Sequence, residues 1–162
     1  VVGRLDAQVR AQLIVEVAQR RGDGDAPAHR EAQTVGPPRP LARILGWSEA
    51  GVDPLDMGEA PVPAVRRLLR AHGMAVADID LWELNEAFSA QLLVCQRQLS
   101  IPAERLNVAG GGVALGHPIG ATGARIVCTL IHQLRQRGGG LGIATLGIGG
   151  GLGLALLLET EP

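Results

Sequence analysis

Residues 110–125 read GGGVALGHPIGATGAR, and this stretch decides how the rest of the chain is interpreted. Its glycines allow the backbone to approach a ligand or another strand closely. His117 lies between Gly116 and Pro118 on a loop, a usual place for a histidine that activates a nucleophile near neutral pH. The helix expected next presents free N–H groups, which favour negative charge. The alternative is a structural turn whose histidine is satisfied by backbone hydrogen bonds.

Strand and helix patterns alternate around this loop, which predicts a layered α/β domain. Glycine or proline punctuates the boundaries, for example the Gly73 stop signal. The expected helices are residues 62–72, 89–99 and 124–137, and the expected strands are 40–47, 78–84, 142–148 and 152–159. Before them, apolar residues recur every four positions over residues 5–17, and residues 20–40 have the composition of a linker.

Composition excludes several function classes. The 162 residues are 46% hydrophobic and 19% charged, which is compatible with a packed core. Lys is absent, so P-loop chemistry and Schiff-base lysines are excluded. The net charge is −1, there is no basic stripe and there are three aromatic residues, which argues against nucleic-acid binding. We also expect no complete dinucleotide-binding fingerprint, because no GxGxxG occurs.

The cysteines Cys95 and Cys128 each lie in an apolar helical run, so we expect both to be buried and inert. Two thiols at this spacing make neither a disulfide framework nor a zinc site, and the other histidines lack partners at ligand spacing. We therefore expect no metal, a reducing compartment and a cytoplasmic protein without a signal peptide. Trp47 and Trp82 are expected in the core.

Residues 138–158 are uncharged over 21 positions, long enough to cross a bilayer as a helix. Nine of them are glycine, and each glycine costs roughly 1 kcal/mol in a helix. Two buried strands joined by a tight glycine turn fit the pattern better. We expect no membrane span.

Two further segments carry candidate polar groups. Asn85 begins NEAF after an expected strand, where an Asn holds a water, polarises a carbonyl or caps the following helix. Glu86 is expected to be structural. The glycines of residues 147–151 offer bare amides for an oxyanion hole or make a tight bend.

DIDLWELNEAFSAQ, NVAGGGVALGHPIGATGAR and GIATLGIGGGLGLALLLE, in this order, resemble the C-terminal half of the thiolases, the acetyl-CoA acyltransferase family. The resemblance covers about residues 38–160 and implies a thiolase-like layered fold, a mixed sheet flanked by helices. No stretch resembles the first strand and helix of that half. Residues 1–37 are then a helix and linker that only distantly resemble the substrate-loop region, and 38–162 are the C-terminal domain.

The resemblance implies acyl transfer on coenzyme A thioesters, with coenzyme A as substrate and no covalently bound cofactor. A nucleophilic cysteine takes the acyl group, His117 matches the histidine that activates it, and Asn85 matches the Asn that holds an oxyanion-hole water. In the C-x-G motif, Gly149 matches the glycine whose N–H lines the other oxyanion hole. Gly147 stands where the family has its acid/base cysteine.

These departures leave competing hypotheses open. The family nucleophile lies in the N-terminal half, and neither cysteine of this chain lies in a matching motif. The chain is then a truncated or degenerate thiolase that is inactive alone, or a non-catalytic subunit that binds a partner thiolase chain. We expect a homo-oligomer or association with a thiolase chain. A nucleotide-binding module is a third reading, which no complete phosphate-loop signature supports.

Overall fold

A computed structural model describes residues 40–161. The helix predicted over residues 5–17 and nearly all of the predicted linker lie outside this range. In chain order the elements are β1 (Arg43–Gly51), η1 (Pro54–Glu59), α3 (Pro61–His72), η2 (Val76–Asp78), β2 (Leu81–Leu84), α4 (Ser89–Leu99), η3 (Ala103–Arg105), α5 (Gly112–Leu115), α6 (Thr122–Gln136), β3 (Gly140–Gly149) and β4 (Leu152–Thr160).

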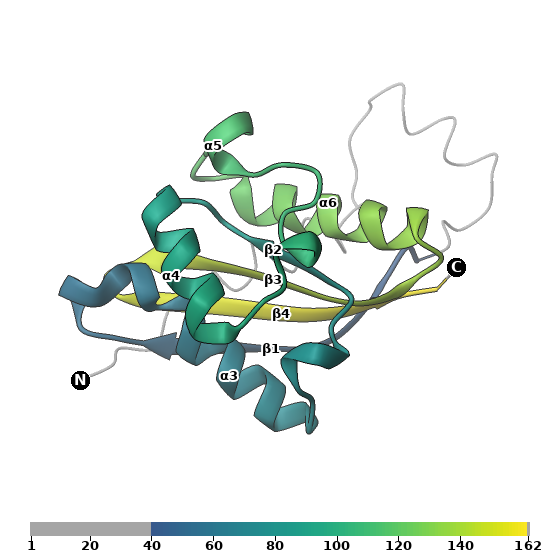
Figure 1. Ribbon diagram of the computed structural model, residues 1–162, viewed down its shortest axis with the longest axis horizontal. Coiled ribbons are helices and arrows are strands. Elements are labelled where there is room, and N and C mark those ends of the chain that lie inside the picture. Colours follow the sequence, from purple (N-terminus) through teal and green to yellow (C-terminus); the bar gives the residue numbers. More distant parts are fainter. Residues whose placement is uncertain (1–39, 162) are drawn as a thin grey trace, which may run out of the picture. The chain divides into compact units, whose positions relative to one another are not determined.

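The strands form one mixed sheet in the order β1-β4-β3-β2 (Figure 1). Strands β2 and β3 are parallel, whereas β4 is antiparallel to both of its neighbours. The predicted glycine hairpin is present as β3 and β4, and most of its apolar residues are buried beneath the helices. No helix among the described residues is long and apolar enough to span a membrane.

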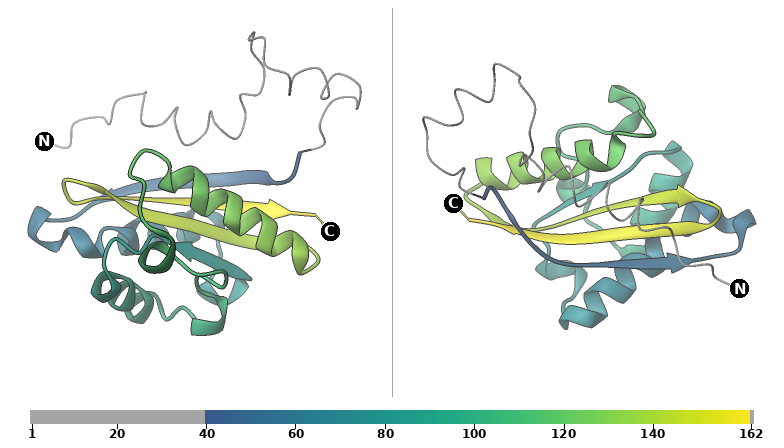
Figure 2. Two further views of the ribbon diagram at one scale, coloured as in Figure 1. Left: turned by 90° about the horizontal axis from the view of Figure 1, so that it is seen from above. Right: turned by 180° about the vertical axis from the view of Figure 1, so that it is seen from behind.

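Helices cover the two faces of the sheet differently (Figure 2). Helices α3 and α4 pack on one face, where their apolar side chains join Trp82, Leu84, Ile143 and Leu157 in one cluster. Helix α6 packs on the other face, mainly over β2 and β3. The mixed sheet flanked by helices that the resemblance implied is therefore confirmed.

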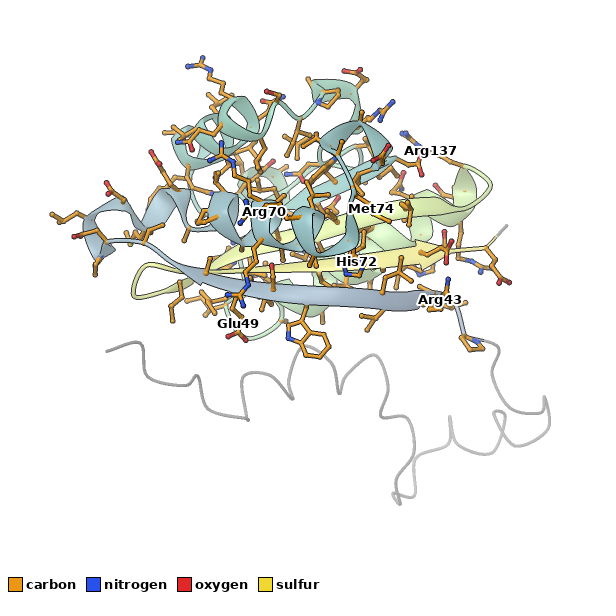
Figure 3. The ribbon with its side chains drawn as sticks, turned by 90° about the horizontal axis from the view of Figure 1, so that it is seen from below. Arg43, Glu49, Arg70, His72, Met74 and Arg137 are labelled. Carbon is orange, nitrogen blue, oxygen red and sulfur yellow. The ribbon has the colours of Figure 1, made fainter. Side chains whose placement is uncertain are left out.

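Helix α3 shows why these residues fold as predicted. Pro61 stands in its first turn, where the missing N–H costs nothing, and Gly73 ends it in the left-handed conformation with φ of 64°. The Ser48 hydroxyl donates to the Ala64 carbonyl at 2.5 Å and ties the helix to β1. Figure 3 shows His72 over β1, where a Cβ at Gly46 would collide with its ring.

Two of the burial predictions are wrong. Cys128 is exposed, because α6 buries the stripe through Ile126, Leu130 and Leu134 and the thiol lies off that stripe. Trp47 is 54% exposed, because β1 directs Ser48 toward α3 and therefore Trp47 toward the opposite face, beyond the strands that α6 covers. The other two residues, Cys95 and Trp82, are buried as predicted.

Candidate functional site

Strand β2 ends at Leu84, and Asn85 follows it at the end of the sheet where β3 also ends. The backbone N–H of Asn85 donates to the Thr145 carbonyl at 2.9 Å, so the parallel pairing continues one residue beyond the strand. Because the carboxyl ends of parallel strands meet at one edge, Asn85 and the β3–β4 turn lie at the same end of the sheet (Figure 1). The NEAF segment and the glycine turn are thus brought to one end.

The Asn85 side chain is buried without a partner. It is 1% exposed, and neither its amide nitrogen nor its carbonyl oxygen has a hydrogen bond. The capping alternative is wrong, since α4 begins after Phe88 and Asn85 lies three residues before that position. Buried amides normally have partners, and a side-chain amide in this place is suited to bind a water or a polar group of a ligand.

Glu86 ties the NEAF segment to the glycine-rich loop. Its carboxylate accepts the Asn107 side-chain amide and the Val113 backbone amide, both at 2.9 Å. Asn107 in turn accepts from the Leu84 amide at 2.8 Å and donates to the Leu84 carbonyl at 2.9 Å, as a neighbouring strand would. These hydrogen bonds fix the backbone at the end of β2, just before Asn85. Glu86 therefore has the structural role that was expected from the sequence.

His117 lies on the loop between α5 and α6 and is exposed. Its Nδ1 is 2.7 Å from the Thr122 hydroxyl, a side-chain partner rather than the backbone partner of the structural-turn alternative. Gly116 before it has φ of 90°, a conformation that glycine adopts without strain. Backbone geometry and Thr122 therefore hold a histidine whose Nε2 has no hydrogen bond among the described residues.

The β3–β4 turn contains Gly147 and Gly149 on either side of a register shift. Gly149 is exposed and has φ of 88°, a backbone conformation that glycine adopts without strain. At Gly147 an added Cβ would lie 3.8 Å from the Met57 carbonyl, an ordinary contact. The position has room for a Cβ, so packing does not require glycine there.

A buried carboxylate with a half-buried Arg nearby lies beside the site and was not predicted from the sequence. Glu83 is 2% exposed, and neither carboxylate oxygen has a hydrogen-bond partner. Its burial raises the pKa to about 7, while the nearby Arg125 guanidinium lowers it and Glu86 raises it. Two guanidinium nitrogens of Arg125 are also buried without a partner. The one signal was a charged residue in the otherwise apolar strand LWEL.

Neither thiol has a hydrogen bond to His117 or Asn85. Cys95 is in the cluster beneath α3 and α4, with the Gly58 carbonyl 3.3 Å from its sulfur. Cys128 is six residues along α6 from Thr122, a distance of about 9 Å at the helical rise. No group of three His, Cys, Asp or Glu side chains that could hold a metal exists among the described residues.

Apolar side chains stand exposed on the segments around the site. Leu55 is 94% exposed on η1, Ile119 is 86% exposed beside His117, and Phe88, Val113 and Leu115 are also exposed. Figure 2 shows η1, α5, the start of α6 and the β3–β4 turn at one end of the sheet. Such a concentration of exposed apolar groups is typical of a surface that another chain segment covers.

Comparison with known proteins agrees with the thiolase resemblance noted in the sequence. The family model described as "Thiolase, C-terminal domain" matches residues 38–160. The Escherichia coli acetyl-CoA acetyltransferase is 52% identical over 120 residues, which are 74% of this chain and 30% of that protein. The mouse cytosolic acetyl-CoA acetyltransferase is 46% identical over 121 residues, 75% of this chain and 30% of that protein.

Solved structures extend the likeness to three dimensions. The Bacillus anthracis acetyl-CoA acetyltransferase superimposes with a TM-score of 0.74 at 51% identity, over 81% of this chain and 33% of that one. The Ascaris suum Acat5 thiolase in complex with coenzyme A gives 0.73 at 45% identity, over 80% and 34%. This chain thus spans about a third of the length of its relatives. It belongs to the thiolase family and carries the C-terminal domain of that family's fold.

Proposed function

We propose that this chain supplies the C-terminal part of a site for acyl transfer on coenzyme A thioesters, and that it is inactive alone. The observation that supports this most is the buried side-chain amide of Asn85, which has no partner among the described residues. It lies just after β2, at the end of the sheet where the glycine turn also lies. The relatives' names and the coenzyme A bound by the Ascaris suum thiolase point to the substrate class.

The chemistry assigns a role to each residue. In thiolysis of a 3-ketoacyl-CoA, a cysteine thiol passes its proton to His117, and the thiolate attacks the 3-keto carbon. The bond between the α- and β-carbons breaks, and the acetyl-CoA enolate leaves. A water on Asn85 donates to its developing oxyanion, and the Gly149 amide donates at the other oxyanion hole. A proton must then reach the α-carbon from a second acid. The thiol of coenzyme A gives its proton to the conjugate base of that acid and attacks the acyl-cysteine, and the released cysteine thiolate takes its proton back from His117.

Two groups of this sequence of steps are missing from the chain. Neither thiol lies beside His117, and Gly147 has no proton to deliver to the α-carbon. Since catalytic groups act as a unit, their loss leaves little of the rate. The proposal also includes a domain boundary after residue 37 and a cytoplasmic location. The match that begins at residue 38 and the cytosolic relative support them.

A second candidate is a non-catalytic subunit that binds a partner thiolase chain or a second copy of itself. The exposed apolar side chains around the site favour it, because Leu55 and Ile119 would be buried by such a partner. Size-exclusion chromatography with light scattering distinguishes the cases. A dilute monomer with a cooperative thermal transition would count against any association through this surface.

A chimera tests the acyl-transfer proposal. Residues 38–160 replace the matching part of the Escherichia coli relative, which then supplies the nucleophile. The chimera with Gly147→Cys should cleave acetoacetyl-CoA with a kcat roughly 100-fold or more above that of the unmodified chimera, since proton transfer by a positioned group contributes about 10²–10⁴-fold.

Matched variants make the chimera decisive. Gly147→Ser adds a side chain of similar size without a thiol and should stay at the unmodified level. His117→Ala in the Gly147→Cys background should abolish turnover. Full activity of the unmodified chimera, or a correctly assembled Gly147→Cys chimera without turnover, would refute the assigned roles.

A further inference from the structure

We propose that Thr122 is a positioning residue that fixes His117 in the tautomer protonated at Nδ1, so that Nε2 remains the base. This inference rests on the proposed function, in which His117 takes a proton from a thiol. Only an unprotonated ring nitrogen can accept that proton, so the tautomer decides whether His117 is competent.

Thr122 is placed for this role by the start of α6. It is the first residue of the helix and is completely buried. Its hydroxyl oxygen lies 2.7 Å from Nδ1 of His117 and 3.0 Å from the carbonyl oxygen of Pro118. The Pro118 carbonyl also accepts the Ala121 and Thr122 amides at 2.8 and 2.9 Å. The turn therefore holds the hydroxyl between the carbonyl and the ring.

The direction in which the Thr122 hydroxyl donates its single proton decides the tautomer. A threonine hydroxyl has one proton, and donation to the carbonyl four residues earlier is a common pattern for threonine in helices. With that proton on Pro118, the hydroxyl presents only lone pairs to the ring, so Nδ1 must carry the hydrogen of the 2.7 Å contact. A neutral imidazole has one N–H, and Nε2 is then the acceptor. In the opposite arrangement the hydroxyl donates to Nδ1, and Nε2 carries the proton.

The Nδ1–H tautomer needs this support because it is the less favoured form of a free histidine side chain. The hydrogen bond made by one ring nitrogen determines whether the other nitrogen is protonated. Without the Thr122 hydroxyl, His117 should therefore return to the Nε2–H tautomer that a free side chain prefers. Thr122 thereby acts on the reaction through His117, without touching the substrate. A hydroxyl is the required feature, whereas the methyl group only fills buried space.

Nitrogen-15 NMR of the full chain, labelled at histidine and held at a pH where imidazoles are neutral, tests this directly. The His117 signals are assigned by their loss in His117→Gln. We expect a protonated Nδ1 and an unprotonated Nε2 in the unmodified chain. In Thr122→Val, which keeps the side-chain shape, the major tautomer should reverse to Nε2–H. Thr122→Ser should restore the original signals, and His132 on the exposed side of α6 should not change.

Two results overturn the proposal: Nε2–H as the major tautomer of the unmodified chain, or an unchanged tautomer in a folded Thr122→Val variant. If Thr122→Val does not fold, Nε2–H in either the unmodified chain or Thr122→Ser overturns it equally. No substrate or turnover enters the measurement. A wrong tautomer is therefore distinguishable from a failure of the acyl-transfer proposal, which the chimera tests.

Discussion

The two faces of the sheet differ in what they bury. On the face beneath α3 and α4, strand β2 places Trp82 and Leu84 in an apolar cluster. On the face beneath α6, the same strand places Glu83 after Leu81, and Asn85 follows with the same alternation. One short strand thus contributes to a stable core on one side and to costly, unpartnered polar groups on the other. Such polar groups are retained where they have a function.

Truncating neighbouring residues on opposite faces should give the largest contrast. Leu84→Ala should lower the free energy of unfolding by about 2–5 kcal/mol, because it leaves a cavity in the packed cluster. Asn85→Ala should cost less than about 1 kcal/mol or stabilise the chain, because it removes a buried amide that has no partner. Urea unfolding of both variants measures this. Equal costs would mean that Asn85 is held by interactions as strong as the core.

The pH dependence of stability should isolate Glu83. Its folded pKa of about 7 lies above the ordinary 4.5, so between these values the folded chain holds a proton that the unfolded chain has released. Stability therefore falls as pH rises through this window, and the contribution of Glu83 is fully present only below about 4.5. A pKa difference of this size corresponds to on the order of 3 kcal/mol.

The matched variant is Glu83→Gln, which keeps the shape and removes the titration. Urea unfolding at several pH values should give a difference between the two proteins that grows from about pH 4.5 to 7, with the variant the more stable above 7. All other ionisable groups are the same in the two proteins, so their effect cancels. A flat difference would show that the Glu83 carboxylate is solvated or paired.

Two glycines paired across the hairpin give a smaller contrast. Gly147 on β3 faces Gly153 on β4. An added Cβ at Gly153 would collide with the Ala60 carbonyl, whereas at Gly147 it would make an ordinary contact. Gly153→Ala should cost about 1–3 kcal/mol, and Gly147→Ala should be neutral or stabilising within about 1 kcal/mol. Thermal unfolding compares them, and a strongly destabilising Gly147→Ala would mean that position 147 cannot accept a thiol side chain.

The two cysteines should differ in reactivity without any change in stability. Cys128 is exposed, whereas burial raises the pKa of the Cys95 thiol. Iodoacetamide should add one group to the native chain, at Cys128, and a second only after unfolding, because the thiolate is the reactive form. Peptide mass spectrometry locates the adducts. Native modification at Cys95 first would show that the cluster beneath α4 opens readily.

Local sequence patterns predicted the elements well, because each has its own signal. The glycine triplet between two apolar runs indicated the β3–β4 hairpin, and the helical period ending at Gly73 indicated α3. The glycine-rich loop was predicted to run to residue 123, yet it contains α5, and α6 begins at Thr122. Short helical turns lack a periodic signal of their own.

Contacts between distant segments were not predictable in the same way. The exposure of Trp47 depends on how far α6 extends across the sheet, and the sequence of β1 does not contain that information. The burial of Glu83 similarly depends on the packing of α6. His117 and Asn85 were found from their motifs, whereas the Thr122 contact that orients the ring required the folded loop.

The central claim is that this chain supplies only part of an acyl-transfer site and is inactive alone. Its most direct test is a thiolysis assay of the purified chain with acetoacetyl-CoA and free coenzyme A. The chain contains His117 and Asn85 but has no thiol beside them and glycine at position 147. We predict no turnover above the uncatalysed rate. Measurable turnover that disappears in His117→Ala would contradict the central claim, because the chain would then hold a complete site.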